Sequence, residues 1–277
     1  MTDVLDGVRE HYHSNGLVER VKRALAVFGP EEQRLSPEQL GTLDQFHTLG
    51  LAATAELARL AGIEADMSVL DVGAGLGGPA RLLNQTYGCR VIGVDLSEAF
   101  VATASYLTQR TAQTKEVSFQ VANAVELPFA NGSFDAVFLQ HVAMNVADRP
   151  RLYREICRVL KPRGRFATFD VVLSEDGAEP EYPVPWARRP DTSFLLTAAA
   201  TRDSIEAAGF NTLTWQDDTE PAKAWFAQLR ASGPPPSPNL GVVMGADTPQ
   251  IIANLARNLM QGRLRILTAV FEAHHRS

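Results

Sequence analysis

The hydrophobic positions of the chain follow two different spacings. Between about residues 17 and 62 they recur at the period of an α-helix, which predicts amphipathic helices. Three helical segments are expected there, at 16–29, 36–46 and 50–63. Farther along, compact apolar runs are bounded by polar or turn residues, as is typical of buried strands. Five such runs occupy 68–75, 90–97, 117–124, 134–141 and 164–173.

Amphipathic segments lie between these apolar runs, at 77–88, 98–113 and 149–162. Strands that alternate with helices at this spacing predict a mostly parallel sheet with helices on both faces, an α/β fold. Two further strands are expected at 211–219 and 264–275, which makes a seven-stranded sheet.

The domain organisation follows from the same change of spacing. We expect residues 1–62 to form an N-terminal helical cap and residues 63–277 to form the core. The stretch 174–200 is rich in proline and acidic residues, and long irregular segments of this kind are often lids or binding loops. Lid insertions are therefore expected at about 174–200 and at about 220–262, with Trp186 as the preferred lid residue.

The composition excludes some classes of function. Of 277 residues, 45% are apolar and 21% are charged, and the net charge is −6 without a basic run. We therefore expect no nucleic-acid partner. No apolar run reaches the roughly 18 residues of a membrane span, and the N-terminus lacks the apolar region of a signal peptide, so a cytoplasmic protein is expected. Cys89 and Cys157 have no metal-ligand spacing, so no metal site is expected, and the oligomeric state is left open.

A glycine-rich loop follows the first predicted strand. It reads Asp71-Val72-Gly73-Ala74-Gly75-Leu76-Gly77-Gly78 and leads into a helix, whose amide end is electropositive. Asp95 ends the next strand, where an open α/β sheet places a carboxylate that accepts hydrogen bonds from a ribose. We therefore expect an adenosine-containing cofactor. The glycine spacing does not decide which one, because Gly78 could serve as the third glycine of a dinucleotide-binding loop.

Four segments resemble, in order, the motifs of class I S-adenosylmethionine (SAM)-dependent methyltransferases. They are VLDVGAGLGG (69–78), VIGVDLS (91–97), VANAVELPFANGSFDAVF (121–138) and EICRVLKPRGRFATFD (155–170). The flanking DQFHTLGLAATAELARLAGI and GAGLGGPARLL are similar to the sarcosine/dimethylglycine N-methyltransferase-like group. The resemblance implies a Rossmann-like fold, SAM as cofactor with S-adenosylhomocysteine as product, and a small-molecule methyl acceptor.

The resemblance also implies roles for particular residues. Glycines 73, 75 and 77, with Ala74 between them, would line the methionine part of SAM, and Asp71 would hold loop amides or the cofactor's amino group. Asp95 would bind the ribose, Leu96 would pack on the adenine, and Gln140 would face the methionine end. His47 and Arg81 would lie near the SAM carboxylate, with a solvated helix residue as the alternative for Arg81. The complete set is His47, Asp71, Gly73, Ala74, Gly75, Gly77, Arg81, Asp95, Leu96, Asn123, Ala124 and Gln140.

The segment Asn123-Ala124 departs from the family pattern, in which many members have Asp-Ala. An aspartate would accept a hydrogen bond from the adenine amino group. The amide oxygen of Asn123 can accept in the same way, but without the assistance of a charge. Weaker binding at this contact is therefore expected.

Three residues are candidates for catalysis: His141, Asp170 and Asn145. A hydroxyl or enol acceptor usually needs a base, and histidine suits this role near neutral pH. His141 follows Gln140 at a strand end, so it is either a substrate contact or base, or a structural histidine. Asp170 either faces the same cleft or caps a loop. The family pattern commonly has aspartate at position 141 and histidine at position 145, and both departures put an amine substrate in doubt.

The main expectation is thus a SAM-dependent enzyme that methylates a nitrogen, oxygen or carbon atom of a small molecule by in-line displacement. One alternative is a SAM-binding regulator without catalysis. Another is an NAD-dependent oxidoreductase, for which the chain lacks a Tyr-x-x-x-Lys or a similar hydride-transfer set.

Overall fold

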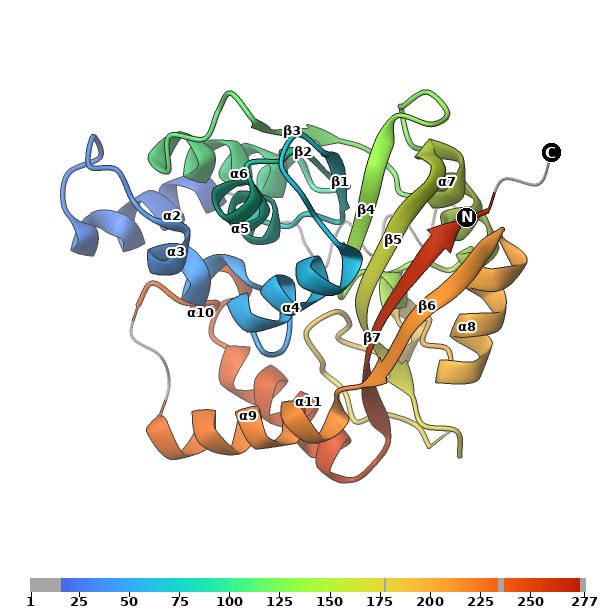
Figure 1. Ribbon diagram of the computed structural model, residues 1–277. Helices are drawn as coiled ribbons and strands as arrows, with labels where there is room; N and C mark the ends of the chain where they lie inside the picture. The colour runs from blue at the N-terminus through green and yellow to red at the C-terminus, as the bar shows by residue number, and fades with distance from the viewer. Residues whose placement is uncertain (1–15, 177, 234–236, 275–277) are drawn as a thin grey trace.

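A seven-stranded sheet runs through the computed structural model, which describes residues 16–176, 178–233 and 237–274 (Figure 1). The order across the sheet is β3-β2-β1-β4-β5-β7-β6. Strands β1 to β5 are parallel, and β7 runs antiparallel to both of its neighbours, β5 and β6. The strands are β1 (Ser68–Val72), β2 (Arg90–Asp95), β3 (Val117–Val121), β4 (Phe134–Gln140), β5 (Leu160–Leu173), β6 (Phe210–Asp217) and β7 (Leu264–Ala273). The predicted mostly parallel, Rossmann-like sheet is confirmed.

The direction of chain progression reverses between β1 and β4. From β1 the chain moves outward through β2 to β3, and it then returns to pair β4 with the other edge of β1. At such a switch point the loops diverge and leave a crevice at the carboxyl ends of the strands. The carboxyl ends of β2 and β4 carry Asp95 and Gln140, two of the residues predicted to bind the cofactor.

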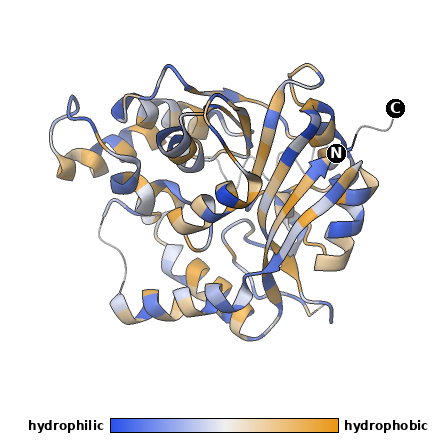
Figure 2. Cartoon of the chain, in the orientation of Figure 1, coloured by the Kyte–Doolittle hydropathy of each residue, from blue (hydrophilic) through white to orange (hydrophobic). Residues whose placement is uncertain are grey.

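Helices cover both faces of the sheet. One face packs on α4 (Leu51–Ala61), α5 (Gly78–Tyr87), α9 (Thr219–Ser232) and α11 (Thr248–Met260). The other packs on α7 (Arg149–Val159) and α8 (Ala198–Ala207), while α6 (Glu98–Arg110) lies along β2 and β3. The helices carry both hydrophilic and hydrophobic stretches (Figure 2), as expected when one side of each helix is buried.

The N-terminal helices pack on different parts of the core. Helices α2 (Leu17–Leu25) and α3 (Pro37–Asp44) share a separate apolar cluster with residues of α6, and the short η1 (Ala26–Phe28) follows α2. Helix α2 packs on α6, and α3 packs on α5. The α3 helix begins with a capping box of Ser36 and Gln39, which satisfies two backbone amides that the first turn leaves without partners. In contrast, α4 packs directly on the sheet through its buried Leu57. The division between cap and core at residue 62 stays a prediction.

The segments after β5 and β6 fold over the carboxyl ends of the strands. The described residues between β5 and α8, 174–176 and 178–197, belong to a long connection that contains the short 3-10 helix η3 (Pro190–Thr192). The connection between β6 and β7 contains α9, α10 (Gly241–Met244) and α11, and α10 packs on α2 and α3. Within the described ranges, we find no helix that is long and apolar enough to cross a membrane.

The boundary between α7 and β5 differs from its prediction. The amphipathic pattern was expected to continue as helix to residue 162, but α7 ends at Val159 and β5 begins at Leu160. Leu160 pairs with Phe134 of β4, and the register then shifts before Ala136 pairs with Arg165. Apolar spacing alone cannot distinguish the last turn of a helix from the first residues of a buried strand.

Candidate functional site

The glycine loop connects β1 to α5 with three residues in the left-handed region. The φ angles are +73° at Gly73, +54° at Gly75 and +77° at Gly77, which residues with a Cβ atom rarely adopt. Space is also limiting, since a Cβ on Gly73 would lie 2.3 Å from Cγ2 of Val142. The loop backbone thus lies close to Val142, just after the end of β4, and glycine fits there because it has no Cβ atom.

Asp71 lies just before this loop and is 2% exposed. Its Oδ2 atom has no hydrogen-bond partner in the part of the chain that the structure describes. Burial raises the pKa of Asp71 to about 7, and the nearby negative charge of Asp95 acts in the same direction. A buried carboxylate oxygen without a partner is costly, so this atom is suited to bind a cationic or hydrogen-bond-donating ligand.

Asp95 joins the end of β2 to the glycine loop. One carboxylate oxygen accepts a hydrogen bond from the N–H of Gly75 and the other from the N–H of Ser97, both at 2.9 Å. Burial raises the pKa of Asp95 to about 6. Each oxygen keeps a further lone pair after these two bonds, so the carboxylate can still accept from a ligand hydroxyl. Leu96 follows Asp95 and is half-buried.

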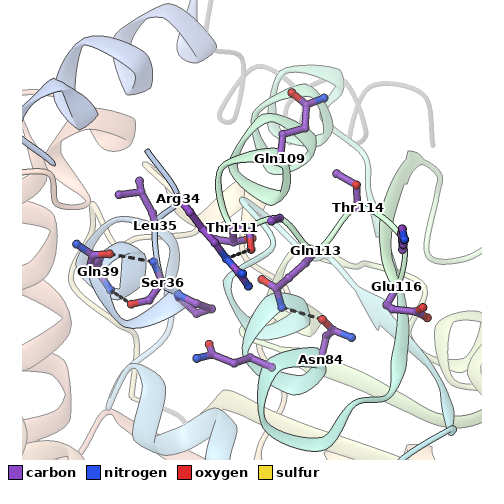
Figure 3. Close-up of a pocket in the computed structure, with 14 residues that line it drawn as sticks. Arg34, Leu35, Ser36, Gln39, Asn84, Gln109, Thr111, Gln113, Thr114 and Glu116 are labelled. Carbon is purple, nitrogen blue, oxygen red and sulfur yellow. Dashed lines mark hydrogen bonds between the residues drawn. The ribbon is translucent and has the colours of Figure 1, made fainter. Parts of the chain in front are cut away.

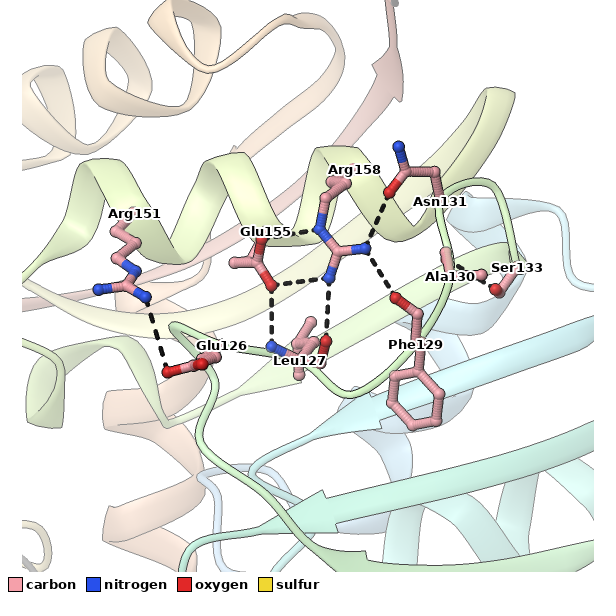
Figure 4. Close-up of polar contacts among 9 residues, drawn as sticks. All are labelled: Glu126, Leu127, Phe129, Ala130, Asn131, Ser133, Arg151, Glu155 and Arg158. Carbon is pink, nitrogen blue, oxygen red and sulfur yellow. Dashed lines mark hydrogen bonds and ion pairs between the residues drawn. The ribbon is translucent and has the colours of Figure 1, made fainter.

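The loop after β3 carries Asn123 and Ala124 and is fixed from α7 (Figure 4). Arg158 donates to the carbonyl groups of Leu127 and Phe129, at 2.9 and 2.7 Å. Its partner Glu155 accepts the N–H of Leu127 at 2.8 Å. Within the loop, Oδ1 of Asn123 accepts from the N–H of Val125 at 3.2 Å. The Asn123 side chain therefore stabilises its own turn.

A chain of buried side chains runs from α4 to the end of β4. Nδ1 of His47 lies 3.2 Å from the carbonyl oxygen of Thr48, so this nitrogen carries the proton. Nε2 of the neutral ring then accepts from the hydroxyl of Thr54, at 3.1 Å. The side-chain amide of Gln140 donates to the same hydroxyl at 3.2 Å. Burial lowers the pKa of His47 to about 4, so the ring is neutral near pH 7.

His141 follows Gln140 and differs from it in having an unsatisfied ring atom. Its Nε2 atom is buried and has no hydrogen-bond partner among the described residues. Its φ angle is +54°, a left-handed conformation that costs free energy in a residue other than glycine and is often found at functional sites. Burial and the nearby His47 lower the pKa of His141 well below its ordinary value, so this ring is also neutral.

Arg81 is not the solvated helix residue that the sequence left open as an alternative. It is fully buried, and its guanidinium donates to a carboxylate oxygen of Asp44 and to the carbonyl of Leu76, both at 2.6 Å. It also donates to the carbonyl of Ala104 and to the hydroxyl of Thr108 on α6, at 3.2 and 3.1 Å. The guanidinium thus binds other parts of the protein instead of facing solvent.

The carboxylate of Asp170 bonds to the backbone. Its two oxygens accept the N–H groups of Ala143 and Val171, at 3.1 and 2.9 Å, and burial raises its pKa to about 6. Since side chains alternate along a strand, Asp170 points to the face opposite Phe169, the ring that contacts both histidines.

Asn145 lies in a 3-10 turn, η2 (Ala143–Asn145), just after β4. It donates a hydrogen bond to the carbonyl of Trp186 at 2.8 Å. Trp186 is 2% exposed, so the predicted lid residue is packed into the protein. Asn145 therefore joins the end of β4 to the loop that follows β5.

The sequence did not single out Thr54, Phe169 or Asp44. Thr54 is in an apolar helical segment, and Phe169 is in an apolar strand, so both look like ordinary core residues. A hydroxyl on the buried side of α4 is the one local signal that could have identified Thr54. Asp44 meets Arg81 across 37 residues of sequence, a contact that local spacing does not reveal.

The surface also has a groove, which lies away from the residues described above. This groove of about 1010 Å³ is formed by residues 34–37, 39, 84–85, 109 and 111–116, next to the amino end of β3 (Figure 3). Most of its lining side chains are polar, and Gln113 donates to Oδ1 of Asn84 within it. None of the residues predicted for cofactor binding or catalysis lines this groove.

Residues 70–168 match the family model described as a methyltransferase domain. The match extends from β1 into β5 and includes the glycine loop, Asp95, Asn123 and His141. This central segment is therefore a methyltransferase domain of the class I, SAM-dependent type, and SAM is the cofactor of such domains.

Two curated relatives are methyltransferases with different acceptor atoms in their names. The chain is 30% identical over 182 residues to the sterol 24-C-methyltransferase of Kluyveromyces lactis, which covers 62% of this chain and 48% of that protein. It is 29% identical over 164 residues to an O-methyltransferase of Aspergillus sclerotiorum, covering 59% and 62%. The chain thus spans about half the length of the sterol relative.

The fold is similar to that of a solved enzyme over nearly the whole chain. The geranyl diphosphate C-methyltransferase from Streptomyces coelicolor A3(2) superposes with a TM-score of 0.72 and 18% identity, and the superposition covers 98% of both chains. At this identity the likeness concerns the fold alone. It agrees with the sheet order and with helices on both faces.

Proposed function

We propose that the chain is a SAM-dependent methyltransferase that transfers a methyl group to a small-molecule acceptor by in-line displacement. One observation carries the proposal: the carboxylate of Asp95 is hydrogen-bonded to the N–H of Gly75, which joins the second strand end to the glycine loop. This is the arrangement that an adenosine-containing cofactor needs in an open α/β sheet. The methyltransferase domain over 70–168 selects SAM over NAD.

The described residues fit this cofactor. The unpartnered Oδ2 of Asp71 is suited to the cofactor's ammonium group, and the remaining lone pairs of Asp95 are suited to ribose hydroxyls. The residues proposed to contact SAM are His47, Asp71, Gly73, Ala74, Gly75, Gly77, Asp95, Leu96, Asn123, Ala124 and Gln140. Nη1 and Nη2 of Arg81 already donate to protein groups, while Nε has no partner among the described residues, and Arg81 is proposed to act on the site indirectly.

When bound, SAM supplies a methyl group that is already activated on a sulfonium. The protein then has to orient the acceptor, exclude water and remove a proton where the acceptor has one. The hydrogen-bonded chain of Gln140, Thr54 and His47 fixes one wall of the site. We assign proton removal to Nε2 of His141, because this neutral, buried nitrogen is without a partner in the described chain.

We infer that the preferred acceptor is neutral and presents a hydroxyl, an enol or a nucleophilic carbon. Both histidines at the end of β4 are held neutral, and the cluster of His47, Thr54, Gln140 and His141 contains no carboxylate. An ammonium acceptor would therefore gain no ion pair from this cluster. The alternative is an amine, as the likeness to the sarcosine/dimethylglycine N-methyltransferase-like group implies.

A transfer screen with methyl-labelled SAM distinguishes these acceptors. Phenols, enolisable acids and isoprenoid alkenes are tested beside sarcosine and dimethylglycine at several pH values. Transfer to a neutral acceptor that is lost in His141→Asn supports the assignment. Transfer to sarcosine alone would replace it with the amine alternative.

A further inference from the structure

Arg81 is the only arginine in the described ranges that ranks among the fully buried side chains. It extends from α5 and donates to groups on three other segments, namely Asp44 of α3, Leu76 of the glycine loop, and Ala104 and Thr108 of α6. The α6 helix begins just after Asp95, Leu76 is part of the glycine loop, and Asp44 ends α3 three residues before His47, so each segment leads to a residue of the proposed cofactor site. One side chain therefore connects three parts of that site.

Asp44 gives Arg81 its link to the N-terminal helices. Its carboxylate is 1% exposed and accepts from the guanidinium at 2.6 Å. The backbone of Asp44 also lies against the start of α5, since a Cβ on Gly78 would be only 2.5 Å from its carbonyl oxygen. The end of α3 therefore rests directly on the helix that the glycine loop leads into.

Residues 44–48, which we call the cap segment, contribute two rings to the proposed cofactor site, and the ring of Phe46 lies beside the glycine loop. The ring of Phe46 would be 3.5 Å from a Cβ on Gly75, and His47 bonds to the hydroxyl of Thr54. The position of the cap segment is set at its first residue by the ion pair with Arg81. Any shift at Asp44 is transmitted to Phe46 and His47 through only a few bonds.

A buried ion pair is a costly way to join two helices. The desolvation of both charges often cancels their attraction, and apolar residues of similar volume frequently stabilise a fold as well or better. The arginine fork, however, can hold several oxygen acceptors in fixed directions, which apolar side chains cannot do. Here the fork holds the carbonyl of Leu76, the middle residue between Gly75 and Gly77.

We propose that the Arg81–Asp44 pair is a positioning device, which fixes the glycine loop and the cap segment relative to each other so that both can contact SAM. The inference rests on the proposed function, since it assigns the pair to the cofactor site. Arg81 and Asp44 are positioning residues that act through the Leu76 carbonyl and through Phe46 and His47. The pair serves cofactor affinity more than it serves stability.

The test separates affinity from stability with one double variant. Arg81→Met and Asp44→Asn each leave one buried group without its partner, so both should lower Tm. The double variant D44N/R81M removes both charges, so its Tm should recover toward that of the wild type. Its Kd for SAM, measured by isothermal titration well below Tm, should stay about tenfold or more above the wild type, because the loop carbonyl is no longer held.

Two further variants keep the proposal falsifiable. Arg110→Met is the matched control: Arg110 is also buried and bonds the carbonyls of Pro30 and Gln33 to α6, but it does not contact the glycine loop. It should lower Tm with little change in the Kd for SAM. Arg81→Lys keeps the charge without the planar fork, and it should fold and still bind SAM weakly.

Specific outcomes overturn the inference. A double variant that binds SAM as tightly as the wild type would show that the pair does not position the site. Equal losses of affinity in R81M and R110M would show that any loosening of the N-terminal helices has the same effect. If the wild type itself fails to bind SAM, the proposed function fails, and this result is distinct from both.

Discussion

The imidazole of His141 stacks on the phenyl ring of Phe169, with ring centroids 5.2 Å apart and planes 9° apart. His141 is the first residue after β4, and Phe169 is on β5, opposite Gln140 in the register. The stacking fixes the imidazole plane beside His47, whose centroid is 6.0 Å away. A histidine that is held in one orientation, with Nε2 unpartnered among the described residues, is prepared to bind a substrate atom.

Replacing His141 should affect turnover and not cofactor binding. His141→Asn keeps a residue that tolerates the left-handed backbone but removes the basic nitrogen. If His141 is a general base, kcat should fall by about 10²–10⁴, with the Kd for SAM nearly unchanged. His141→Ala should behave in the same way. Unchanged turnover in both variants would remove His141 from this role.

Asp71 should make SAM binding depend on pH. Its pKa is raised to about 7 by burial and by Asp95, so a fraction of the carboxyl groups is protonated at neutral pH. A cationic ligand favours the ionised form, so binding should release a proton and tighten as the pH rises from 6 to 8. Titration calorimetry in buffers of different ionisation enthalpy measures this proton.

Asp71→Asn provides the control for that pH dependence. The variant should bind SAM more weakly and lose the part of the pH dependence that comes from the protein. Because the cofactor's own titration is the same in both proteins, it cancels in the comparison. Identical pH profiles for wild type and variant would contradict the role of Asp71.

Asn123→Asp should tighten SAM binding. The carboxylate can keep the hydrogen bond from the N–H of Val125, which Asn123 already accepts, so the turn is preserved. It also adds a charge-assisted bond to the adenine amino group, worth about fivefold in Kd. Asn123→Ala is the matched variant, which loses both the proposed contact with adenine and the side-chain hydrogen bond that stabilises the turn. Weaker binding by Asn123→Asp would argue against adenine at this position.

Asp170→Asn tests whether the carboxylate caps a turn or takes part in chemistry. One carboxylate oxygen becomes an NH₂ group that faces a backbone N–H, so the free energy of unfolding should fall by about 1–3 kcal/mol. Turnover should fall much less than in His141→Asn. Denaturant titration and kcat distinguish the two roles: a large loss of turnover at unchanged stability would support the catalytic role of Asp170 over the cap.

The sheet and the glycine loop could be predicted because their signals are local. Apolar runs, turn residues and the spacing from Gly73 to Asp95 each lie within a short stretch of chain. The environment of Arg81 could not be predicted, because its partner Asp44 is 37 residues away on a helix with an unremarkable pattern. The bond from Asn145 to Trp186, 41 residues later, could not be predicted for the same reason. Contacts between distant segments determine where these side chains lie. The hydrophobic periodicity of a single segment does not reveal such contacts.

Isothermal titration of the wild-type chain with SAM, and separately with NAD, tests the central claim most directly. The structure has a glycine loop, Asp71 and Asp95 suited to SAM, so SAM should bind with one site per chain, and Asp95→Ala should weaken it strongly. NAD should give no comparable heat. Binding of NAD without binding of SAM would contradict the account.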